Sequence, residues 1–381
     1  MPRQTEIIPL SPPHPGSTRH LRLHRYGTPG QGPKAYMHSS LHAGEWPGLL
    51  TLQHLINLLD EADAEGRIVG EIVLLPYANP LGFGQRVNGQ LVGRYHFDGG
   101  GNFNRNWPNL TEVVADAVEG KLGDDTLKNI QLIRQALKTA VDDLPGRSEL
   151  DELRRILMGL SVDADIVLDL HCDQLATLHV YANYAQQDDA TVLTRDLGSP
   201  VLLLEDEPGG GSFDETNHGP WIRLQKRFGL DDAIARQCFA VTVELRGETD
   251  ITDQQAEQDA RALLRFLMRK GVVSGDPGAL PDQVNEATPL NGVDVPEAPA
   301  AGVLAWRVKP GDTISKNQHI ADLVDIDADD PKSARTPIHA ETGGFLFARR
   351  AAVLVRPGDQ ICKIAGAETL DYRKDGALLA P

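Results

Sequence analysis

Short apolar runs alternate with helical patterns over residues 1–275, and this alternation constrains the fold more than any other feature. Four runs are typical of buried strands because they are short, rich in Val, Ile and Leu, and bounded by turns. They cover 68–76, 165–171, 200–204 and 239–245, and helical patterns cover 45–64, 126–142, 149–160, 219–228 and 252–270. Strands that alternate with helices predict an α/β domain with a largely parallel or mixed sheet, whose ligand sites lie at the carboxyl ends of strands.

The composition changes after residue 275. Residues 276–297 are rich in Pro, Gly, Asn and Asp and indicate a linker. Residues 298–381 contain short strand patterns in two similar halves, each with a Pro-Gly-Asp turn, at 310–312 and 357–359. This segment resembles a lipoyl/biotinyl-type barrel, but Lys332 lacks the flanking residues of a modified lysine. We therefore predict three parts: a catalytic domain (1–275), a linker (276–297) and a small all-β domain (298–381) with a structural or gating role.

The charge balance excludes several classes of partner. Lys and Arg number 37 against 54 Asp and Glu, which gives a net charge of −17. So negative a chain disfavours nucleic acid and anionic membrane surfaces, and we found no apolar run long enough to span a bilayer. The N-terminal residues lack the apolar core of a secretory signal, and the three cysteines are far apart. These features predict a cytoplasmic protein that acts on a small molecule.

Three residues have the types and positions of metal ligands. His42 and Glu45 follow a short strand, and an i, i+3 spacing on the first turn of a helix would put both side chains on one face. His171 ends an apolar strand in which alternation points Val167, Asp169 and His171 to one face. Two His, one Glu and an open fourth position form a catalytic zinc site. The alternative is a helix-terminal pair that binds no metal.

Further motifs carry a family resemblance. In chain order the sequence contains HAGE (42–45), NPLGF (79–83), an arginine, NFNRNW (102–107), the strand-final His171, and ELR (244–246). This order resembles the zinc carboxypeptidase superfamily, and in particular its succinylglutamate desuccinylase/aspartoacylase branch. The resemblance implies a three-layer α/β/α sandwich with a mixed sheet. It also implies one Zn²⁺ per chain, held by His42, Glu45 and His171.

The same resemblance implies roles for other residues. Glu244 would act as general base and acid, and Arg94 would stabilise the oxyanion, with Arg86 as the alternative because the spacing in this segment varies. Asn104 and Arg105 would hold a substrate carboxylate. Arg246 would support the site or bind substrate, or else form a structural ion pair.

The implied activity is hydrolysis of an amide bond in a small N-acyl amino acid. A metallocarboxypeptidase acting on short peptides with a free carboxylate needs the same groups, so it remains an alternative. A non-catalytic binding module is the alternative from a different class. The sequence leaves the formation of a homo-oligomer open.

Overall fold

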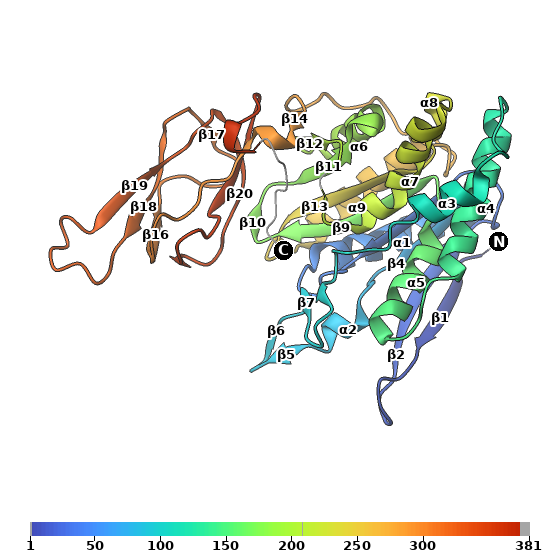
Figure 1. The fold of residues 1–381 in the computed structure, drawn as a ribbon, viewed down its shortest axis with the longest axis horizontal. Helices are drawn as coiled ribbons and strands as arrows, with labels where there is room; N and C mark the ends of the chain where they lie inside the picture. Colours follow the sequence, from blue (N-terminus) through green and yellow to red (C-terminus); the bar gives the residue numbers. More distant parts are fainter. Residues whose placement is uncertain (1, 208, 374–381) are drawn as a thin grey trace.

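The computed structural model describes residues 2–207 and 209–373. A nine-stranded sheet lies at its centre, with helices on both sides, and the C-terminal strands extend to one end of the molecule (Figure 1). From one edge to the other, the strands are β1 (Gln4–Leu10), β2 (Arg19–Tyr26), β4 (Glu71–Leu75), β3 (Lys34–Ser39), β9 (Ile166–Asp173), β13 (Phe239–Gly247), β11 (His179–Asn183), β12 (Val201–Glu205) and β14 (Thr288–Pro289).

The central sheet is mixed, which confirms the predicted α/β class. β4, β3, β9 and β13 run parallel to one another. β1 and β2 form an antiparallel pair that extends the sheet beyond β4. β11 runs antiparallel to β13, and β12 and β14 then follow β11 in parallel. Because β3, β9 and β13 are parallel neighbours, their carboxyl ends meet at one edge of the sheet, where sites form in α/β proteins.

Each face of the sheet packs against its own helices. Leu168 and Leu170 of β9 lie in an apolar cluster with side chains of α1 (Pro47–Ala64), α6 (Gln187–Leu197) and α9 (Asp253–Arg269). Val167 lies in a second cluster, with α3 (Thr111–Val118), α4 (Thr126–Asp142), α5 (Glu149–Ser161), α7 (Phe213–Phe228) and α8 (Asp232–Ala235). Because side chains alternate along a strand, Asp169 and His171 share the face of Val167, as predicted.

The C-terminal strands form two smaller sheets and cover the β11–β12 end of that same face. One sheet contains β10 (Leu175–Ala176), β20 (Gly344–Arg349), β22 (Cys362–Gly366) and β15 (Val293–Asp294), with β17 (Thr313–Ile314) paired to β20. The other contains β19 (Arg335–His339), β18 (His319–Val324), β16 (Gly302–Trp306) and β21 (Leu354–Val355). Val201 and Leu203 of β12 pack against Phe347 of β20 and Val293 of β15. The polar residues of the central sheet thus lie between the helical layer and these strands.

Short elements complete the description. The segment before the NFNRNW motif contains α2 (Pro80–Phe83) and two small hairpins, formed by β5 (Arg86–Val87) with β6 (Gln90–Leu91) and by β7 (Tyr95–His96) with β8 (Gly101–Asn102). Single 3₁₀ turns cover Tyr184–Gln186, Leu290–Gly292 and Asp371–Arg373. Within the residues predicted as a linker, β14 joins the central sheet and β15 joins a C-terminal sheet. The last eight residues of the predicted C-terminal domain lie outside the described residues.

The four predicted strands correspond to β4, β9, β12 and β13. The helical pattern over 126–142 coincides with α4, and that over 252–270 agrees with α9 within one residue at each end. In contrast, α7 begins at Phe213, six residues before the predicted start at 219. Gly219 and Pro220 are typical of helix breaks, but here they lie inside a helix whose Phe213 and Trp221 are fully buried. Burial of these side chains outweighs the local preference.

His218 of α7 predicts a pH-dependent stability. Its side chain is buried, and burial, followed by the charge of Arg223, lowers its pKa from 6.5 to about 3. Below pH 6.5 the unfolded chain therefore binds a proton at His218 that the folded chain excludes. The free energy of unfolding consequently decreases as the pH falls from 6.5 toward 3. We expect His218→Gln to reduce the loss in unfolding free energy between pH 7 and pH 5 by about 2 kcal/mol. Chemical denaturation at both pH values measures the free energy of unfolding, with the surface variant His54→Gln as control. A decrease between pH 7 and pH 5 that is the same in His218→Gln, in His54→Gln and in the wild-type protein would contradict the prediction.

None of the helices within residues 2–207 and 209–373 has the length and apolar character needed to cross a membrane.

Candidate metal and catalytic site

His42 and Glu45 lie in a tight turn between β3 and α1. The turn precedes the helix, which begins at Pro47, so the expected placement on a first helical turn is wrong. The backbone N–H of Glu45 donates to the carbonyl of His42 (3.0 Å), and the Ser40 hydroxyl donates to the Glu45 carbonyl (2.8 Å). Ser40 has a φ of 55°, a left-handed conformation that bends the chain sharply at the end of β3. This turn brings the two side chains together.

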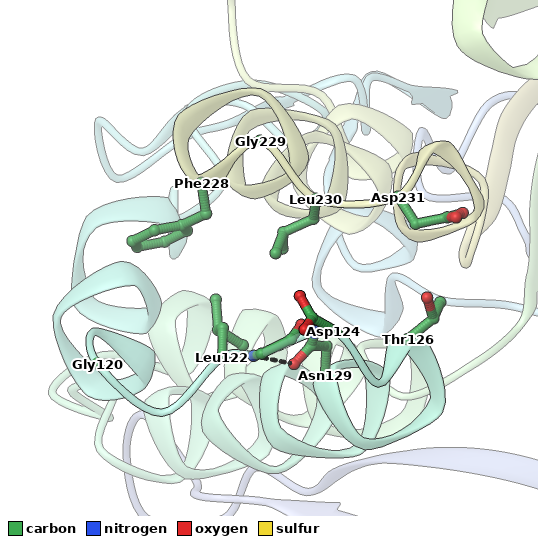
Figure 2. Close-up of a pocket in the computed structure, with 10 residues that line it drawn as sticks. Gly120, Leu122, Asp124, Thr126, Asn129, Phe228, Gly229, Leu230 and Asp231 are labelled. Carbon is green, nitrogen blue, oxygen red and sulfur yellow. Dashed lines mark hydrogen bonds between the residues drawn. The ribbon is translucent and has the colours of Figure 1, made fainter.

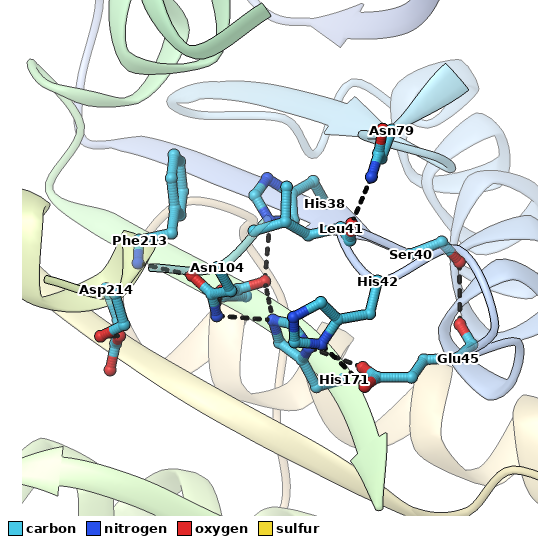
Figure 3. A network of polar contacts seen from close by, with 12 residues as sticks. His38, Ser40, Leu41, His42, Glu45, Asn79, Asn104, His171, Phe213 and Asp214 are labelled. Carbon is cyan, nitrogen blue, oxygen red and sulfur yellow. Dashed lines mark hydrogen bonds and ion pairs between the residues drawn. The ribbon is translucent and has the colours of Figure 1, made fainter. Parts of the chain in front are cut away.

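His171 of β9 joins this pair from the neighbouring strand. Nδ1 of His42 lies 2.8 Å from Oε1 of Glu45, and Nδ1 of His171 lies 2.6 Å from Oε2. One possible ligand atom from each of the three residues lies within 4.8 Å of the others, and all three side chains are buried (Figure 3). The structure thus brings together the three predicted metal ligands.

The outer nitrogens of both histidines are paired with oxygens. Nε2 of His42 lies 2.7 Å from Oδ1 of Asn102, and Nε2 of His171 lies 2.8 Å from Oδ1 of Asp169. An oxygen acceptor at Nε2 holds the proton there and leaves the Nδ1 lone pair free to bind a metal. This is the arrangement found around histidine ligands of zinc, so the residues present fit a divalent metal ion.

A second set of buried contacts holds Asp169 in place. Nε2 of His38 lies 2.7 Å from Oδ1 of Asp169, and the Tyr36 hydroxyl lies 2.9 Å from Nδ1 of His38. The amide of Asn104 donates to Oδ2 of Asp169 (3.2 Å). Burial alone would lower the pKa of His171, but the carboxylates of Asp169 and Glu45 hold it well above the usual value.

Arg94 reaches the metal-ligand group from the segment between β6 and β7. Its Nη1 donates to Oε1 of Glu45 at 2.9 Å. The N–H of Ala43 donates to the carbonyl of Gly93 (3.1 Å), which ties this segment to the His42–Glu45 turn. A Cβ on Gly93 would lie 2.6 Å from both the Ala43 Cβ and the Gly82 carbonyl, so only glycine permits this approach. Arg86, the alternative, bonds the carbonyl of Gly89 (3.4 Å) within its own hairpin.

Glu244 lies beside His171 on the same face of the sheet. The two residues are directly paired in the parallel ladder between β13 and β9. Burial, followed by the charge of Glu45, raises the pKa of Glu244 to about 8. Its Oε2 is buried and has no hydrogen-bond partner among the described residues. A bulge between Glu244 and Gly247 ends the regular pairing.

Asn104 and Arg105 both lie beside the metal-ligand group, but only Arg105 has donors free to bind a substrate. The Asn104 side chain is buried; its Oδ1 accepts from the N–H of Phe213 (2.8 Å), and its nitrogen contacts Asp169 and lies 3.1 Å from Nε2 of His171. Its amide is therefore occupied by the protein itself. Arg105 is half-buried, and its Nη1 donates to the Asn104 carbonyl (2.7 Å). Its other guanidinium nitrogens leave capacity to bind a carboxylate.

Arg246 points away from the cluster into an ion pair. Its two terminal nitrogens donate to both carboxylate oxygens of the buried Asp259 on α9, at 2.7 and 2.8 Å. Bidentate pairing of this kind fixes the guanidinium. This geometry favours the structural ion pair that the sequence left open for Arg246.

Sequence reasoning missed the contacts made by Asn102, Tyr36 and His38. A signal existed for two of them. Tyr36 and His38 alternate along β3 in register with Val167 and Asp169 of β9. Asn102 opens the NFNRNW motif, but nothing in the sequence indicated that it would face His42.

The cavity in Figure 2, of about 560 Å³, lies elsewhere. It is lined by the connection between α3 and α4 and by the end of α7, including Leu122, Asn129 and Phe228. Helix α7 begins at Phe213, which contacts Asn104, and ends at Phe228. At 1.5 Å per residue this separates the cavity from the metal-ligand group by about 22 Å. We therefore do not assign the catalytic site to this cavity.

Comparisons with known proteins identify the family of this chain. A family model described as the succinylglutamate desuccinylase/aspartoacylase catalytic domain matches residues 31–269. The N-alpha-acetyl-L-2,4-diaminobutyric acid deacetylase of Halomonas elongata is 26% identical over 357 residues, which cover 88% of this chain and 83% of that protein.

Solved structures share the fold over nearly the whole chain. A succinylglutamate desuccinylase/aspartoacylase family protein from Shewanella amazonensis has a TM-score of 0.83 and 25% identity, covering 95% of this chain and 98% of its own. Its counterpart from Shewanella frigidimarina has a TM-score of 0.83 and 22% identity, covering 96% and 97%. The family model matches well over half of the sequence. The chain therefore belongs to the succinylglutamate desuccinylase/aspartoacylase family.

Proposed function

We propose that this protein is a zinc-dependent hydrolase that removes the acyl group from a small N-acyl amino acid. The observation that carries the proposal is the group of His42, Glu45 and His171, whose possible ligand atoms lie within 4.8 Å of one another. Beside them lies Glu244, whose buried Oε2 has no hydrogen-bond partner among the described residues. One Zn²⁺ per chain would be held by these three side chains. When bound, the ion supplies Lewis acidity that polarises a carbonyl and lowers the pKa of water. Membership of the family and the deacetylase relative support the N-acyl substrate.

Glu244 would move the proton of the reaction. A carboxylate at this position can take a proton from the attacking water and return it to the nitrogen of the leaving amine. The nitrogen then departs as an amine, and the acyl group departs as a carboxylate. The raised pKa of Glu244 favours the second half of this role, the return of the proton to the leaving nitrogen.

Arg94 would stabilise the negative charge that develops on the carbonyl oxygen. It is a fixed cation beside Glu45, at the mouth of the metal-ligand group, with a half-exposed side chain that leaves donors free. Donors held in advance at such a position lower the barrier to acyl transfer.

Arg105 would bind the carboxylate of the amino acid. Its half-buried guanidinium lies at the end of the NFNRN segment, one residue from the amide that contacts Asp169. Asn104 would position Arg105 and Asp169 rather than touch substrate, because its amide is already bonded. Arg246 would hold β13 to α9 through Asp259.

We further propose that residues 1–275 form the catalytic domain with a carboxypeptidase-like three-layer sandwich, that 276–297 connect it to a small β domain at 298–381, and that the enzyme acts in the cytoplasm. The contacts of β12 and β10 with β20 support a C-terminal part that is integral to the catalytic part, because both faces of the interface are apolar.

A substrate panel tests the activity. Zinc-loaded protein should hydrolyse at least one N-acetyl or N-succinyl amino acid, and should do so at least tenfold better, in kcat/KM, than it hydrolyses dipeptides of the same amino acid. Release of free amine measures both. A reversed preference would make the protein a carboxypeptidase. The absence of turnover of every compound, with metal bound, would leave a binding module as the better account.

A further inference from the structure

A strip of polar side chains continues across the sheet beyond Glu244. His179 of β11 pairs with Glu244, and Tyr181 pairs with Thr242, in the antiparallel ladder between β11 and β13. His171, Glu244 and His179 therefore form one row on one face of three adjacent strands. Neighbouring strands are about 4.8 Å apart, so His179 lies one strand spacing beyond Glu244 on the side away from the metal ligands.

Nε2 of His179 is a buried hydrogen-bond acceptor that has no donor among the described residues. Its side chain is fully buried, and its Nδ1 lies 2.8 Å from the carbonyl of Thr177, which fixes the proton on Nδ1. Burial lowers its pKa to about 4, so the ring is neutral at pH 7 and Nε2 is an acceptor. Within the described part of the chain, Nε2 has no hydrogen-bond partner. A buried polar atom without a hydrogen bond costs free energy unless a ligand or a water molecule forms that bond.

Tyr181 presents a second such group. Its ring lies 5.5 Å from that of His179, and its hydroxyl oxygen is also buried and without a partner among residues 2–207 and 209–373. Burial raises the pKa of this phenol, so it keeps its proton and can donate or accept. In contrast, Tyr184, three residues later, is 42% exposed.

The C-terminal strands supply the third group. Lys363 of β22 reaches the central sheet, where its Nζ lies 2.6 Å from Oδ2 of Asp173, two residues after His171. From the same sheet, Phe347 covers His179 with its ring 4.8 Å away. A largely buried ion pair is a weak source of stability, because desolvation offsets the attraction. The pair is also neutral as a unit, so it adds N–H donors to this wall without adding net charge.

The amino-acid half of a substrate would extend toward these groups. Arg105, the proposed carboxylate site, belongs to a segment that runs beside the loop after β12, where the N–H of Asn106 donates to the carbonyl of Gly210 (2.9 Å). β12 is the next strand after β11. With the scissile bond between the metal ligands and Glu244, a side chain of two to four bonds spans the one strand spacing to His179 and Tyr181.

We propose that His179, Tyr181 and Lys363 form a subsite for the end of the substrate's amino-acid side chain, and that this end carries an N–H or O–H donor. The proposal rests on the proposed deacylase function and adds the substrate class to it. Nε2 of His179 requires a donor, the Tyr181 hydroxyl accepts or donates, and Lys363 donates to an oxygen if the group has one. An amine, a carboxamide and a hydroxyl share this chemistry, whereas an apolar side chain leaves Nε2 of His179 and the Tyr181 hydroxyl unpaired.

Tyr181→Phe tests the subsite, with Tyr184→Phe as the matched control. The substrates are N-acetyl-glutamine and N-acetyl-2,4-diaminobutyrate, compared with the apolar N-acetyl-norvaline on zinc-loaded full-length protein. We expect wild-type kcat/KM to favour at least one polar substrate over norvaline by tenfold or more. Tyr181→Phe should reduce that ratio about tenfold while the melting temperature is unchanged or higher, because the lost hydroxyl has no partner within the described residues. Tyr184→Phe should change neither quantity.

The outcomes separate this proposal from the one on which it rests. An unchanged ratio in Tyr181→Phe, a wild-type preference for norvaline, or a melting temperature lowered by several degrees in Tyr181→Phe would overturn the subsite while leaving the deacylase intact. The two polar substrates distinguish an amine from a carboxamide as the preferred end. No turnover of any N-acetyl amino acid would overturn both proposals.

Discussion

Glu244→Gln is expected to lower kcat/KM for N-acyl amino acids by about 10³-fold, the middle of the range for removal of a general acid–base group. Glutamine keeps the shape of the side chain but can neither take nor return a proton. Metal content should stay the same, because Glu244 is not among the three ligand residues. The melting temperature should not fall, because the substitution replaces a buried carboxyl that has no partner for Oε2 within the described chain.

Glu248→Gln is the matched control for this experiment. Glu248 follows the bulge of β13, is half-buried and also has a raised pKa, with burial as the main cause and Glu45 next. Its loss should change kcat/KM less than threefold. Equal effects of the two substitutions, or a Glu244→Gln enzyme that keeps more than a tenth of wild-type activity, would remove Glu244 from the proposed role.

His171→Ala is expected to abolish both tight zinc binding and activity. The substitution leaves His42 and Glu45, and two protein ligands hold zinc far more weakly than three. It also leaves the buried Asp169 without its contact to Nε2 of His171. Metal content after dialysis should fall from about one zinc per chain to near zero, as elemental analysis can measure.

His54→Ala, which removes a surface histidine paired with Asp253, controls for non-specific loss of metal. Circular dichroism at the assay temperature should show both variants folded, so that lost metal reflects lost coordination. A His171→Ala protein that is folded, retains one zinc and still turns over substrate would show that the zinc is bound elsewhere.

Local sequence patterns were sufficient for the elements that carry strong periodicity. The apolar run 165–171 is buried on both faces in β9, so its length and composition were as informative as its alternation. α4 was predicted to the residue because Asp125 caps its first turn and its apolar face is regular. α7 was not, since its polar N-terminal half and its internal proline contradict a helix unless tertiary burial is known.

The site could be predicted as a set of residues but not as a geometry. The order of motifs indicated His42, Glu45 and His171, and the structure brings them together. The HAGE segment, however, forms a turn rather than a helix, because Pro47 occupies the first helical position and Ser40 takes a left-handed conformation. Asn104 illustrates a further limit: its motif suggested substrate binding, while its amide is bonded to Asp169 and Phe213. Which partners a polar side chain finds depends on contacts far apart in the sequence.

The contact that the C-terminal strands make with the central sheet through Lys363 could also not be predicted from the sequence. Lys363 lies in an unremarkable strand pattern, 190 residues from its partner Asp173. Only the packing of β20 and β22 on β11 and β12 brings it near Glu244, and a pairing over that separation leaves no local signal.

Zinc titration of metal-stripped wild-type protein tests the central claim most directly. The protein would be treated with a chelator, dialysed, and assayed for release of amine from N-acyl amino acids as zinc is added. We predict no activity without metal and a rise that saturates at about one zinc per chain, as a single three-ligand group requires. Full activity in protein shown to be free of metal, or no activity at any zinc concentration with every substrate of the panel, would contradict the account.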